Sequence, residues 1–235
     1  MKNFIFFLLL PFNYVFAQTI SIDIGHHINA PGAISAYGIT EYTYNKRLSY
    51  SLKNQLFNYG NKVNIINEHG NKISLYDRTN LAKGSNFLIY LHHDSLPKKD
   101  LNHWQFQGKK QYFNDNTKGF SIFVSTKNPY FNKSLICANK ISDNLIKAGF
   151  HSNYRKNAIL VSNAGTLFVK NKPIYKYDNL AVLRTASMPA LLIEAGVIVN
   201  RKEAIWIAQE HIRERFSIAV SRAINQCINN NTLKK

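Results

Sequence analysis

The 235-residue sequence predicts an α/β protein, with a single three-layer domain in which helices cover both faces of a mostly parallel, twisted sheet. Short apolar segments alternate along the chain with segments of helical periodicity, and this alternation is typical of parallel strands joined by helices. Two apolar segments, Phe87–Leu91 and Ala190–Glu194, are nearly continuous, as expected for strands that are buried on both faces. Hydrophobic residues make up 45% of the chain, which is enough for the core of one such domain.

Strands are expected where β-branched residues alternate with polar ones or where short apolar runs occur. The first, Thr19–Ile24, alternates and is rich in isoleucine, and the glycine-rich segment Gly25–Gly38 that follows it is expected to be a loop. The expected strands are Thr19–Ile24, Lys62–Asn67, Phe87–Leu91, Gly119–Ser125, Ile159–Val161, Leu180–Leu183 and Ala190–Glu194.

Helices are expected where apolar residues recur at intervals of three or four. In the first helix a tyrosine and three leucines recur every fourth position between Tyr44 and Leu56, and Thr40 is the expected N-cap. Gly84 and Gly149 follow two of the other helices as stop signals. The expected helices are Glu41–Phe57, Ile73–Ala82, Pro129–Lys147 and Arg201–Asn225.

Residues 1–17 have the pattern of a secretory signal peptide. Lys2 supplies a positive charge, Phe4–Phe12 is a short apolar run, and Val15–Ala17 ends in a small residue before Gln18. This run is too short to span a bilayer, which takes roughly 18 to 20 residues, and we expect no transmembrane segment. Residues 18–235 are therefore expected to form an exported domain that is periplasmic or secreted.

The charge is strongly positive. There are 30 Lys and Arg against 13 Asp and Glu, which gives +17, and loss of Lys2 with the signal peptide leaves +16. This charge predicts attraction to a polyanion such as nucleic acid, acidic lipid or an acidic cell-wall polymer. Because the chain has no RNP, KH or zinc-finger pattern and is expected to be exported, we expect no nucleic-acid partner.

The two cysteines and two polar segments leave open questions. Cys137 and Cys227 lie at apolar positions of expected helices, where a disulfide and two buried thiols are both compatible with export. The polar insertion 93–118 is expected to be a substrate-facing loop, although a solvated loop without function is an equal alternative. Residues 229–235 are expected to form a frayed tail.

Acidic and imidazole side chains lie at or just after the carboxyl ends of three expected strands, where open α/β sheets bind ligands. These segments are Asp23–His27, His92–Asp94 and Glu194, and Glu41 opens the helix after the first loop. Two histidines and one glutamate are a ligand set of open catalytic zinc sites. A further carboxylate nearby is the kind of group that accepts and returns the proton of the attacking water.

Four segments in this order resemble the zinc-dependent N-acetylmuramoyl-L-alanine amidases, which cut the stem peptides of peptidoglycan from the glycan. They are Asp23-Ile24-Gly25-His26, Pro31-Gly32-Ala33 with Glu41 after it, Leu91-His92-His93-Asp94-Ser95, and Pro189–Asn200, whose sequence is PALLIEAGVIVN. The resemblance extends from about Thr19 to the last expected helix.

The resemblance implies that His26, Glu41 and His92 bind one Zn²⁺ per chain and that Glu194 is the catalytic acid and base. The bond cut would be the amide between the lactyl group of N-acetylmuramic acid and L-alanine. His27 is the alternative to His26, and His93 is the alternative to His92. Because neighbouring residues of a strand point to opposite faces, only one histidine of the second pair is expected to reach the metal.

Other assignments complete the expected site. Arg184 is expected to bind a stem-peptide carboxylate, with a structural ion pair as its alternative, and Trp104 and Asn200 are expected to contact substrate. Asp23 is expected to orient His26, with a turn cap as the alternative. We expect a monomer whose partner is peptidoglycan, and the need for a protein activator stays open. The rival functions are a zinc exopeptidase or amidohydrolase that acts on peptides and a non-catalytic cell-wall-binding protein.

Overall fold

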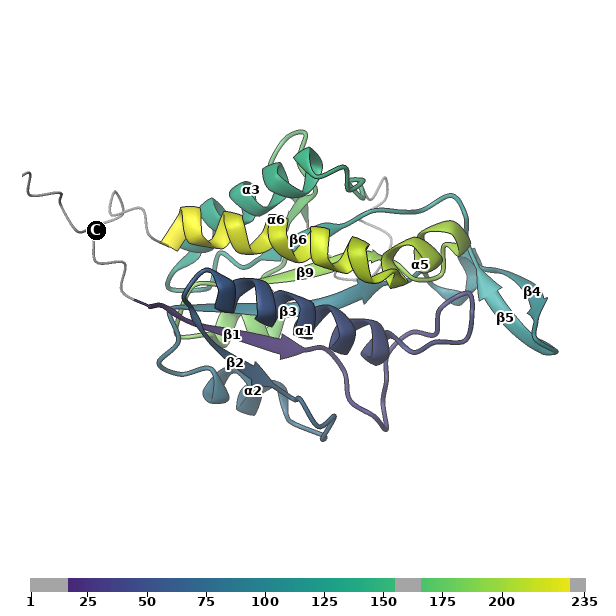
Figure 1. The fold of residues 1–235 in the computed structure, drawn as a ribbon, viewed down its shortest axis with the longest axis horizontal. Coiled ribbons are helices and arrows are strands. Elements are labelled where there is room, and N and C mark those ends of the chain that lie inside the picture. Colours follow the sequence, from purple (N-terminus) through teal and green to yellow (C-terminus); the bar gives the residue numbers. More distant parts are fainter. Residues whose placement is uncertain (1–16, 155–165, 229–235) are drawn as a thin grey trace, which may run out of the picture.

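A computed structural model describes residues 17–154 and 166–228. The strands of its central sheet are β1 (Thr19–Ile24), β2 (Lys62–Ile66), β3 (Phe87–Asp94), β6 (Ser121–Val124), β7 (Thr166–Leu167), β8 (Ile174–Lys176) and β9 (Ala190–Val197). Within the described residues they form one seven-stranded sheet in the order β2-β1-β3-β9-β6-β8-β7 (Figure 1). The strands β2, β1, β3 and β9 run parallel to one another, whereas β6 runs antiparallel to β9. The carboxyl ends of β1, β3 and β9 therefore meet at one edge.

Helices cover both faces of this sheet, which confirms the three-layer α/β expectation. The helices are α1 (Glu41–Asn58), α2 (Leu75–Leu81), α3 (Phe131–Lys147), α4 (Ala181–Thr185), α5 (Arg201–Ala208) and α6 (Glu210–Ile228), and a short 3₁₀ turn spans Lys98–Asp100. The long helices α1, α3 and α6 lie together on one face, in front of the sheet in Figure 1. The short helices α2 and α4 pack against the other face.

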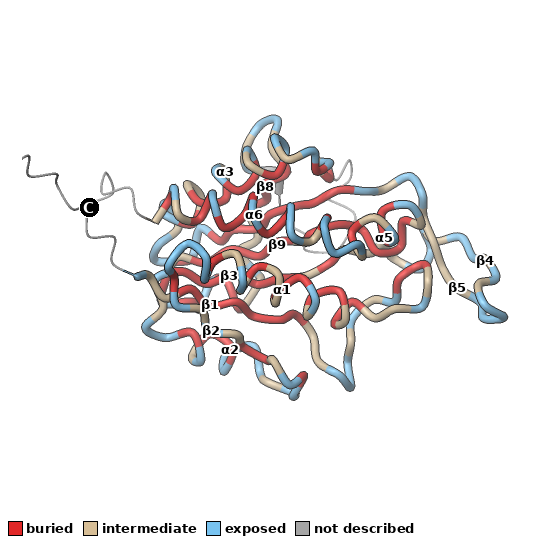
Figure 2. Tube along the Cα trace, viewed as in Figure 1, coloured by how far each residue is buried: buried red, intermediate tan, exposed pale blue. Residues whose placement is uncertain are grey.

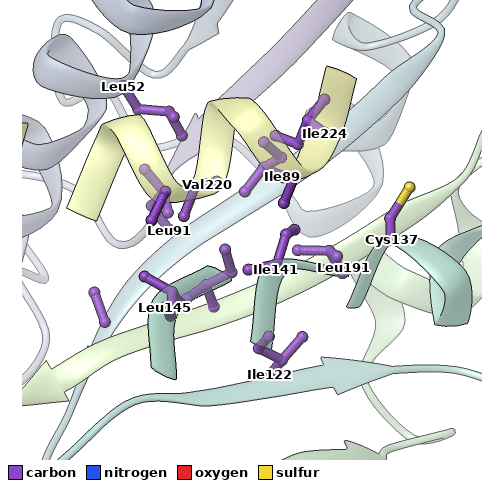
Figure 3. Packing of buried hydrophobic residues seen from close by; sticks show 14 of the residues in the cluster. Leu52, Ile89, Leu91, Ile122, Cys137, Ile141, Leu145, Leu191, Val220 and Ile224 are labelled. Atoms are coloured by element: carbon purple, nitrogen blue, oxygen red, sulfur yellow. The ribbon is translucent and has the colours of Figure 1, made fainter. Parts of the chain in front are cut away.

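The core consists of two main clusters, one on each face of the sheet, because alternate side chains of each strand point to opposite faces. Along β3, Ile89 and Leu91 belong to the cluster beneath the long helices, whereas Leu88 and Tyr90 belong to the cluster beneath the short ones. Figure 3 shows the first cluster, where side chains of α1, α3 and α6 meet those of β3, β6 and β9. The sheet and the inner sides of the long helices are buried, while the loops are exposed (Figure 2).

A disulfide joins two of the long helices. Cys137 of α3 and Cys227 of α6 are bonded, with their Cα atoms 5.3 Å apart and a separation of 90 positions in sequence. Both residues are nearly fully buried within the first cluster. Of the two alternatives that the sequence left open, the structure contains the bridge.

Two expected elements are wrong. Leu180–Leu183 was expected to be a strand, but residues Ala181–Thr185 form helix α4, because a short apolar run does not by itself distinguish strand from helix. The expected helix Arg201–Asn225 is two helices, since Gln209 between them has an extended conformation, with ψ 138°. Strands β7 and β8 were not expected, although Ile174 and Tyr175 are fully buried.

The insertion 93–118 contains a β-hairpin that the sequence analysis did not predict. Strands β4 (Asn102–Phe106) and β5 (Lys109–Phe113) pair antiparallel around Gln107-Gly108, and both turn residues have positive φ, 49° and 72°. This is the backbone that a two-residue hairpin turn requires, and Gln-Gly between two alternating segments was the available signal. The hairpin projects from the carboxyl edge of the sheet (Figure 1).

Three expectations lie outside the described residues: the signal peptide, nearly all of which falls in residues 1–16, the strand Ile159–Val161, and the tail 229–235. Among the helices that the structure describes, none is both long and apolar enough to cross a bilayer.

Candidate metal centre and active-site cleft

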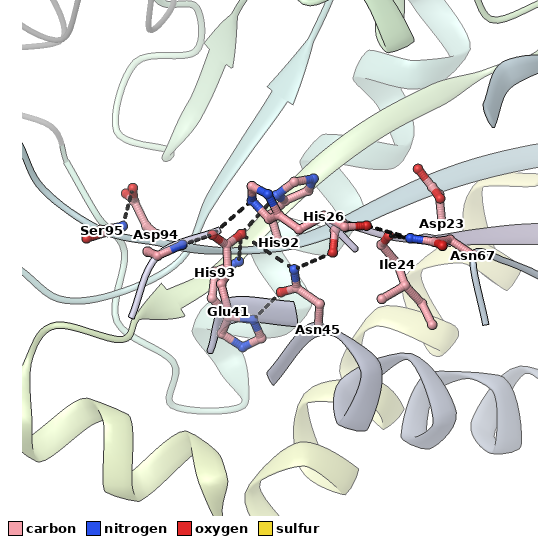
Figure 4. Close-up of polar contacts among 12 residues, drawn as sticks. Asp23, Ile24, His26, Glu41, Asn45, Asn67, His92, His93, Asp94 and Ser95 are labelled. Atoms are coloured by element: carbon pink, nitrogen blue, oxygen red, sulfur yellow. Dashed lines mark hydrogen bonds and ion pairs between the residues drawn. The ribbon is translucent and has the colours of Figure 1, made fainter. Parts of the chain in front are cut away.

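Three side chains converge at the carboxyl edge of the sheet. His26 follows β1, His92 lies near the end of β3, and Glu41 is the first residue of α1. One nitrogen or oxygen atom from each lies within 4.8 Å of the others. The Glu41 carboxylate sits between the two rings, 2.9 Å from His26 Nε2 and 3.0 Å from His92 Nδ1 (Figure 4). The structure thus brings together the three residues expected to bind a metal.

Glu41 is held in place by its own helix and by backbone donors. Thr40 caps α1 as expected, because its side chain accepts a hydrogen bond from the backbone N–H of Thr43. The backbone N–H groups of Ala33 and His93 donate to the Glu41 carboxylate at 3.1 and 3.3 Å. Burial works to raise the pKa of Glu41, but hydrogen bonds from the two histidines outweigh it and hold the pKa below its usual range. Glu41 is therefore an ionised carboxylate at neutral pH.

Two glycines make room for this cluster, which explains why the expected motifs contain them. A Cβ atom on Gly25 would lie 2.4 Å from the His92 ring. A Cβ atom on Gly32 would lie 2.4 Å from Glu41 and 2.6 Å from His26, and Gly32 also has φ +77°. Any larger residue at either position would push a candidate ligand out of the cluster.

The neighbouring histidines occupy different places. His93 points from β3 to the opposite face, where its Nδ1 lies 2.7 Å from Asn45 Oδ1. Burial lowers the pKa of His93 to about 3, so the ring is neutral. His27 lines the cleft but is not part of the close cluster. The structure therefore groups His26 and His92, rather than their neighbours, with Glu41.

A cleft of about 530 Å³ opens beside the three residues. The polar residues that line it include His26, His92 and Glu194, and the apolar ones include Phe123 and Leu192. Glu194 lies directly opposite His92 in the register of β3 and β9, so both side chains point to the same face of the sheet. Glu194 thus shares the cleft with the cluster without belonging to the close group of three.

Asp23 contacts Arg78 rather than the imidazole of His26. The Arg78 Nη1 atom donates to both carboxylate oxygens of Asp23, at 2.8 and 3.0 Å. Burial raises the pKa of Asp23 to about 6, and Arg78 opposes that shift. The link to His26 runs onward from Arg78 Nη2 to the backbone carbonyl of His26, at 2.8 Å. Asn67, which also donates to that carbonyl, and Arg78 were both missed by the sequence analysis.

The residues expected to contact substrate lie in other settings. Trp104 packs the hairpin onto the first loop, with its indole N–H donating to the Ala36 carbonyl at 2.9 Å. Asn200 is buried and caps α5, where it accepts from the backbone N–H of Glu203. Arg184 is exposed on helix α4, not at a strand end, and donates only weakly to the Asn179 carbonyl, at 3.4 Å. None of the three is among the described residues that line the cleft.

A sheet edge that carries two imidazoles, a carboxylate and a separate glutamate in a cleft defines a candidate metal-dependent hydrolase. A family model described as N-acetylmuramoyl-L-alanine amidase matches residues 20–226. The chain therefore belongs to the N-acetylmuramoyl-L-alanine amidases. The expected family and enzyme class are confirmed.

Two relatives carry the same activity in their names, and one solved structure shares the fold. A relative named for the same amidase activity, from Buchnera aphidicola subsp. Acyrthosiphon pisum, is 28% identical over 212 residues, which cover 77% of this chain and 82% of the relative. The amidase AmiC of Neisseria meningitidis serogroup B is 24% identical over 92% of this chain and 54% of its own length. The structure of an N-acetylmuramoyl-L-alanine amidase from Clostridium difficile has a TM-score of 0.71, at 19% identity, over 92% of this chain and 98% of that one. This last likeness shows a shared fold.

Proposed function

We propose that this enzyme is a zinc-dependent amidase of peptidoglycan that hydrolyses the bond between the lactyl group of N-acetylmuramic acid and L-alanine. The observation that carries the proposal is the cluster of His26, Glu41 and His92 beside Glu194 in one cleft. A closely held ligand set and a separate carboxylate are the two parts that amide hydrolysis by activated water requires.

The donor atoms of the cluster fit zinc. Two imidazole nitrogens and a carboxylate oxygen, all within 4.8 Å, match an open site with three protein ligands. The side chains of His26 and His92 are 33% and 21% exposed, so substrate and water have access from the cleft. Zn²⁺ bound there would supply Lewis acidity, which polarises an amide carbonyl and lowers the pKa of water. We expect one ion per chain.

Glu194 is proposed to move the proton. Its carboxylate removes a proton from the attacking water as the oxygen bonds to the lactyl carbonyl carbon. The same proton then passes to the amide nitrogen as the bond to L-alanine breaks, which leaves the free amine of L-alanine and a lactyl carboxylic acid that loses its remaining proton to solvent. Its position beside His92, on the adjacent strand and the same face, supports this role.

The site of action is proposed to be outside the cytoplasm. The first 17 residues have the composition of a signal peptide, and the charge of +16 that remains after their removal favours attraction to an anionic wall. This attraction is expected to weaken as salt increases.

The proposal is tested by zinc content together with digestion of purified sacculi, with the products resolved by mass. We expect about one zinc per chain, stem peptides with free L-alanine amino ends, and glycan without peptides. Glu194→Gln should keep its zinc and lose about 10³-fold in turnover, because general acid–base groups typically supply 10²- to 10⁴-fold.

Other outcomes would point to other functions. Zinc with cleavage of free peptides alone would favour the exopeptidase. Binding to sacculi without released peptide would favour the wall-binding protein. Full turnover in Glu194→Gln would remove this residue as the acid and base.

A further inference from the structure

Side chains from distant parts of the chain donate hydrogen bonds to the backbone carbonyls on either side of Gly25. We propose that Asn67 and Arg78 are positioning residues: they hold the carbonyls of Ile24 and His26 and thereby fix the His26 imidazole where a metal binds. This inference rests on the proposed zinc function and assigns a role to residues that do not touch the metal.

His26 needs support that the other two candidate ligands do not. Glu41 opens helix α1, with its backbone N–H donating to the Ala33 carbonyl at 2.8 Å, and His92 lies within strand β3, paired with Glu194 of β9. His26 lies after the end of β1, in a loop, with φ 67°, a left-handed conformation that residues with a Cβ rarely adopt. The flanking residues make backbone bonds, Gly25 to Leu91 and His27 to Ala30, whereas the His26 carbonyl itself is bonded by side chains from outside the loop.

Asn67 and Arg78, together called the clamp below, each donate hydrogen bonds to both of these carbonyls. The Ile24 carbonyl accepts from Asn67 Nδ2 at 3.2 Å and from Arg78 Nη1 at 2.9 Å. The His26 carbonyl accepts from the same Asn67 amide and from Arg78 Nη2, the latter at 2.8 Å. Figure 4 shows Asn67 on the side of His26 away from Glu41. Two side chains thus hold both carbonyls that flank the Gly25 step.

The clamp is buried and is itself anchored. Asn67 and Arg78 are only 6% and 5% exposed. The Asp23 carboxylate fixes the Arg78 guanidinium through Nη1 from the same strand that precedes His26. Each guanidinium nitrogen of Arg78 donates at least one hydrogen bond, with Nε donating to the Ile73 carbonyl at 3.4 Å, so the side chain has little freedom to move and the carbonyls it holds stay in place.

Gly25, which lies between these two carbonyls, is linked through Asn45 to the candidate metal ligand Glu41. Its carbonyl accepts from Asn45 Nδ2 at 3.2 Å, and the same amide lies 3.5 Å from Glu41 Oε1. The carbonyls of residues 24, 25 and 26 are therefore all held by side chains. A shift of this backbone would move His26 relative to Glu41, which is the distance that matters for a shared metal.

The test measures zinc affinity by competition with a chelator and the visible spectrum of the Co²⁺-substituted protein, which reports ligand geometry. Asn67→Ala should weaken zinc binding by 10- to 100-fold, the usual effect of removing a group that supports a ligand, and should change the cobalt spectrum. Arg78→Lys keeps the charge facing Asp23 but loses the fork that reaches two carbonyls, and it should weaken zinc binding by about tenfold. Because this variant retains the charge, it also keeps the test open if Asn67→Ala does not fold.

Asn128 offers a matched control. It is equally buried, at 3% exposed, and its side-chain amide donates to three backbone carbonyls, those of Leu183, Ala186 and Met188, away from the cluster. Asn128→Ala should lower the melting temperature while zinc affinity stays within twofold of the wild type. A purely structural role for Asn67 would give the same result as this control.

The outcomes separate the clamp from the proposed function. If the wild type binds zinc tightly and the folded Asn67→Ala and Arg78→Lys variants match it in affinity and cobalt spectrum, the clamp is wrong and the zinc site stands. If the wild type binds no zinc, the zinc site and the clamp both fall. Weaker binding in both variants, with the control unchanged, supports the clamp.

Discussion

The two faces of the central sheet are covered very differently. On one face, α1, α3 and α6 have 18, 17 and 19 residues, and a disulfide ties two of them together. On the other face, α2 and α4 have 7 and 5 residues, and the cleft of about 530 Å³ opens there. The two faces therefore differ in role: the first provides most of the buried core, and the second leaves space for a ligand.

Because consecutive side chains of a strand point to opposite faces, neighbouring residues of β3 lie on the two differently covered faces. His92 points to the thinly covered face, where it joins Glu41 and lines the cleft. His93 points to the thickly covered face, where it lies beneath α1 against Asn45 and Tyr44. One step along β3 thus separates a candidate metal ligand from a core residue.

The largest expected effect tests this pair. His92→Ala should weaken zinc binding by more than 10²-fold, beyond the effect of removing a supporting group, and abolish sacculus digestion with little change in unfolding free energy. His93→Ala should lower the unfolding free energy by about 2 kcal/mol, because it leaves a cavity and an unsatisfied amide at Asn45, and should still bind one zinc. Zinc titration and urea unfolding of both variants measure these outcomes. Loss of zinc in His93→Ala alone would reverse the assignment.

The disulfide carries the next largest effect, on the thickly covered face. Joining residues 90 apart in sequence restricts the unfolded chain, and a loop of this length corresponds to about 4.6 kcal/mol in the chain-entropy account. A reductant, or the double substitution Cys137→Ala with Cys227→Ala, should lower the unfolding free energy by roughly this amount and leave zinc stoichiometry unchanged. Urea unfolding with and without reductant measures it.

The double variant is also the control for that experiment. Reductant should shift the unfolding midpoint of the wild type and leave the midpoint of the variant where it is. An equal midpoint for the reduced and oxidised wild type would show that the bridge adds no stability.

The sequence was enough to predict those site residues that lie in a short motif or in an alternating strand. Strand alternation and the order of the motifs were enough to select Glu41 and to expect only one of His92 and His93 at the metal. The glycines of these motifs also have a local reason, because Gly25 and Gly32 border the cluster. The same kind of pattern predicted the strands β1, β3 and β9 and the first long helix.

The rest of the site depends on contacts between distant residues. Arg78 reaches Asp23 across 55 positions and Asn67 reaches His26 across 41, and neither residue belongs to a pattern that marks it. The expected strand at Leu180–Leu183 was wrong for a related reason, because an apolar run of that length is buried equally well as one turn of α4. The hairpin in the insertion had a signal in Gln107-Gly108, but its packing against Tyr37 required the fold.

The smallest effect on stability is expected at an exposed residue that lines the cleft, and it tests the contrast between the two faces. Leu75 of α2 is 55% exposed and lines the cleft, whereas Leu52 of α1 is fully buried under the thickly covered face. Leu52→Ala should cost about 2 to 5 kcal/mol of unfolding free energy, as buried leucines do. Leu75→Ala should cost less than about 0.5 kcal/mol, as an exposed position does.

The same Leu75 substitution should instead act on substrate. If the cleft receives the muropeptide, loss of about 1 kcal/mol of apolar contact raises KM roughly fivefold with kcat unchanged. Ile205→Ala on α5 is the matched control, because Ile205 is 51% exposed and is not among the described residues that line the cleft. Steady-state kinetics on a soluble muropeptide measure both variants. An equal KM for Leu75→Ala and Ile205→Ala would mean that this part of the thinly covered face does not contact the substrate, and the division between the two faces would then be one of stability alone.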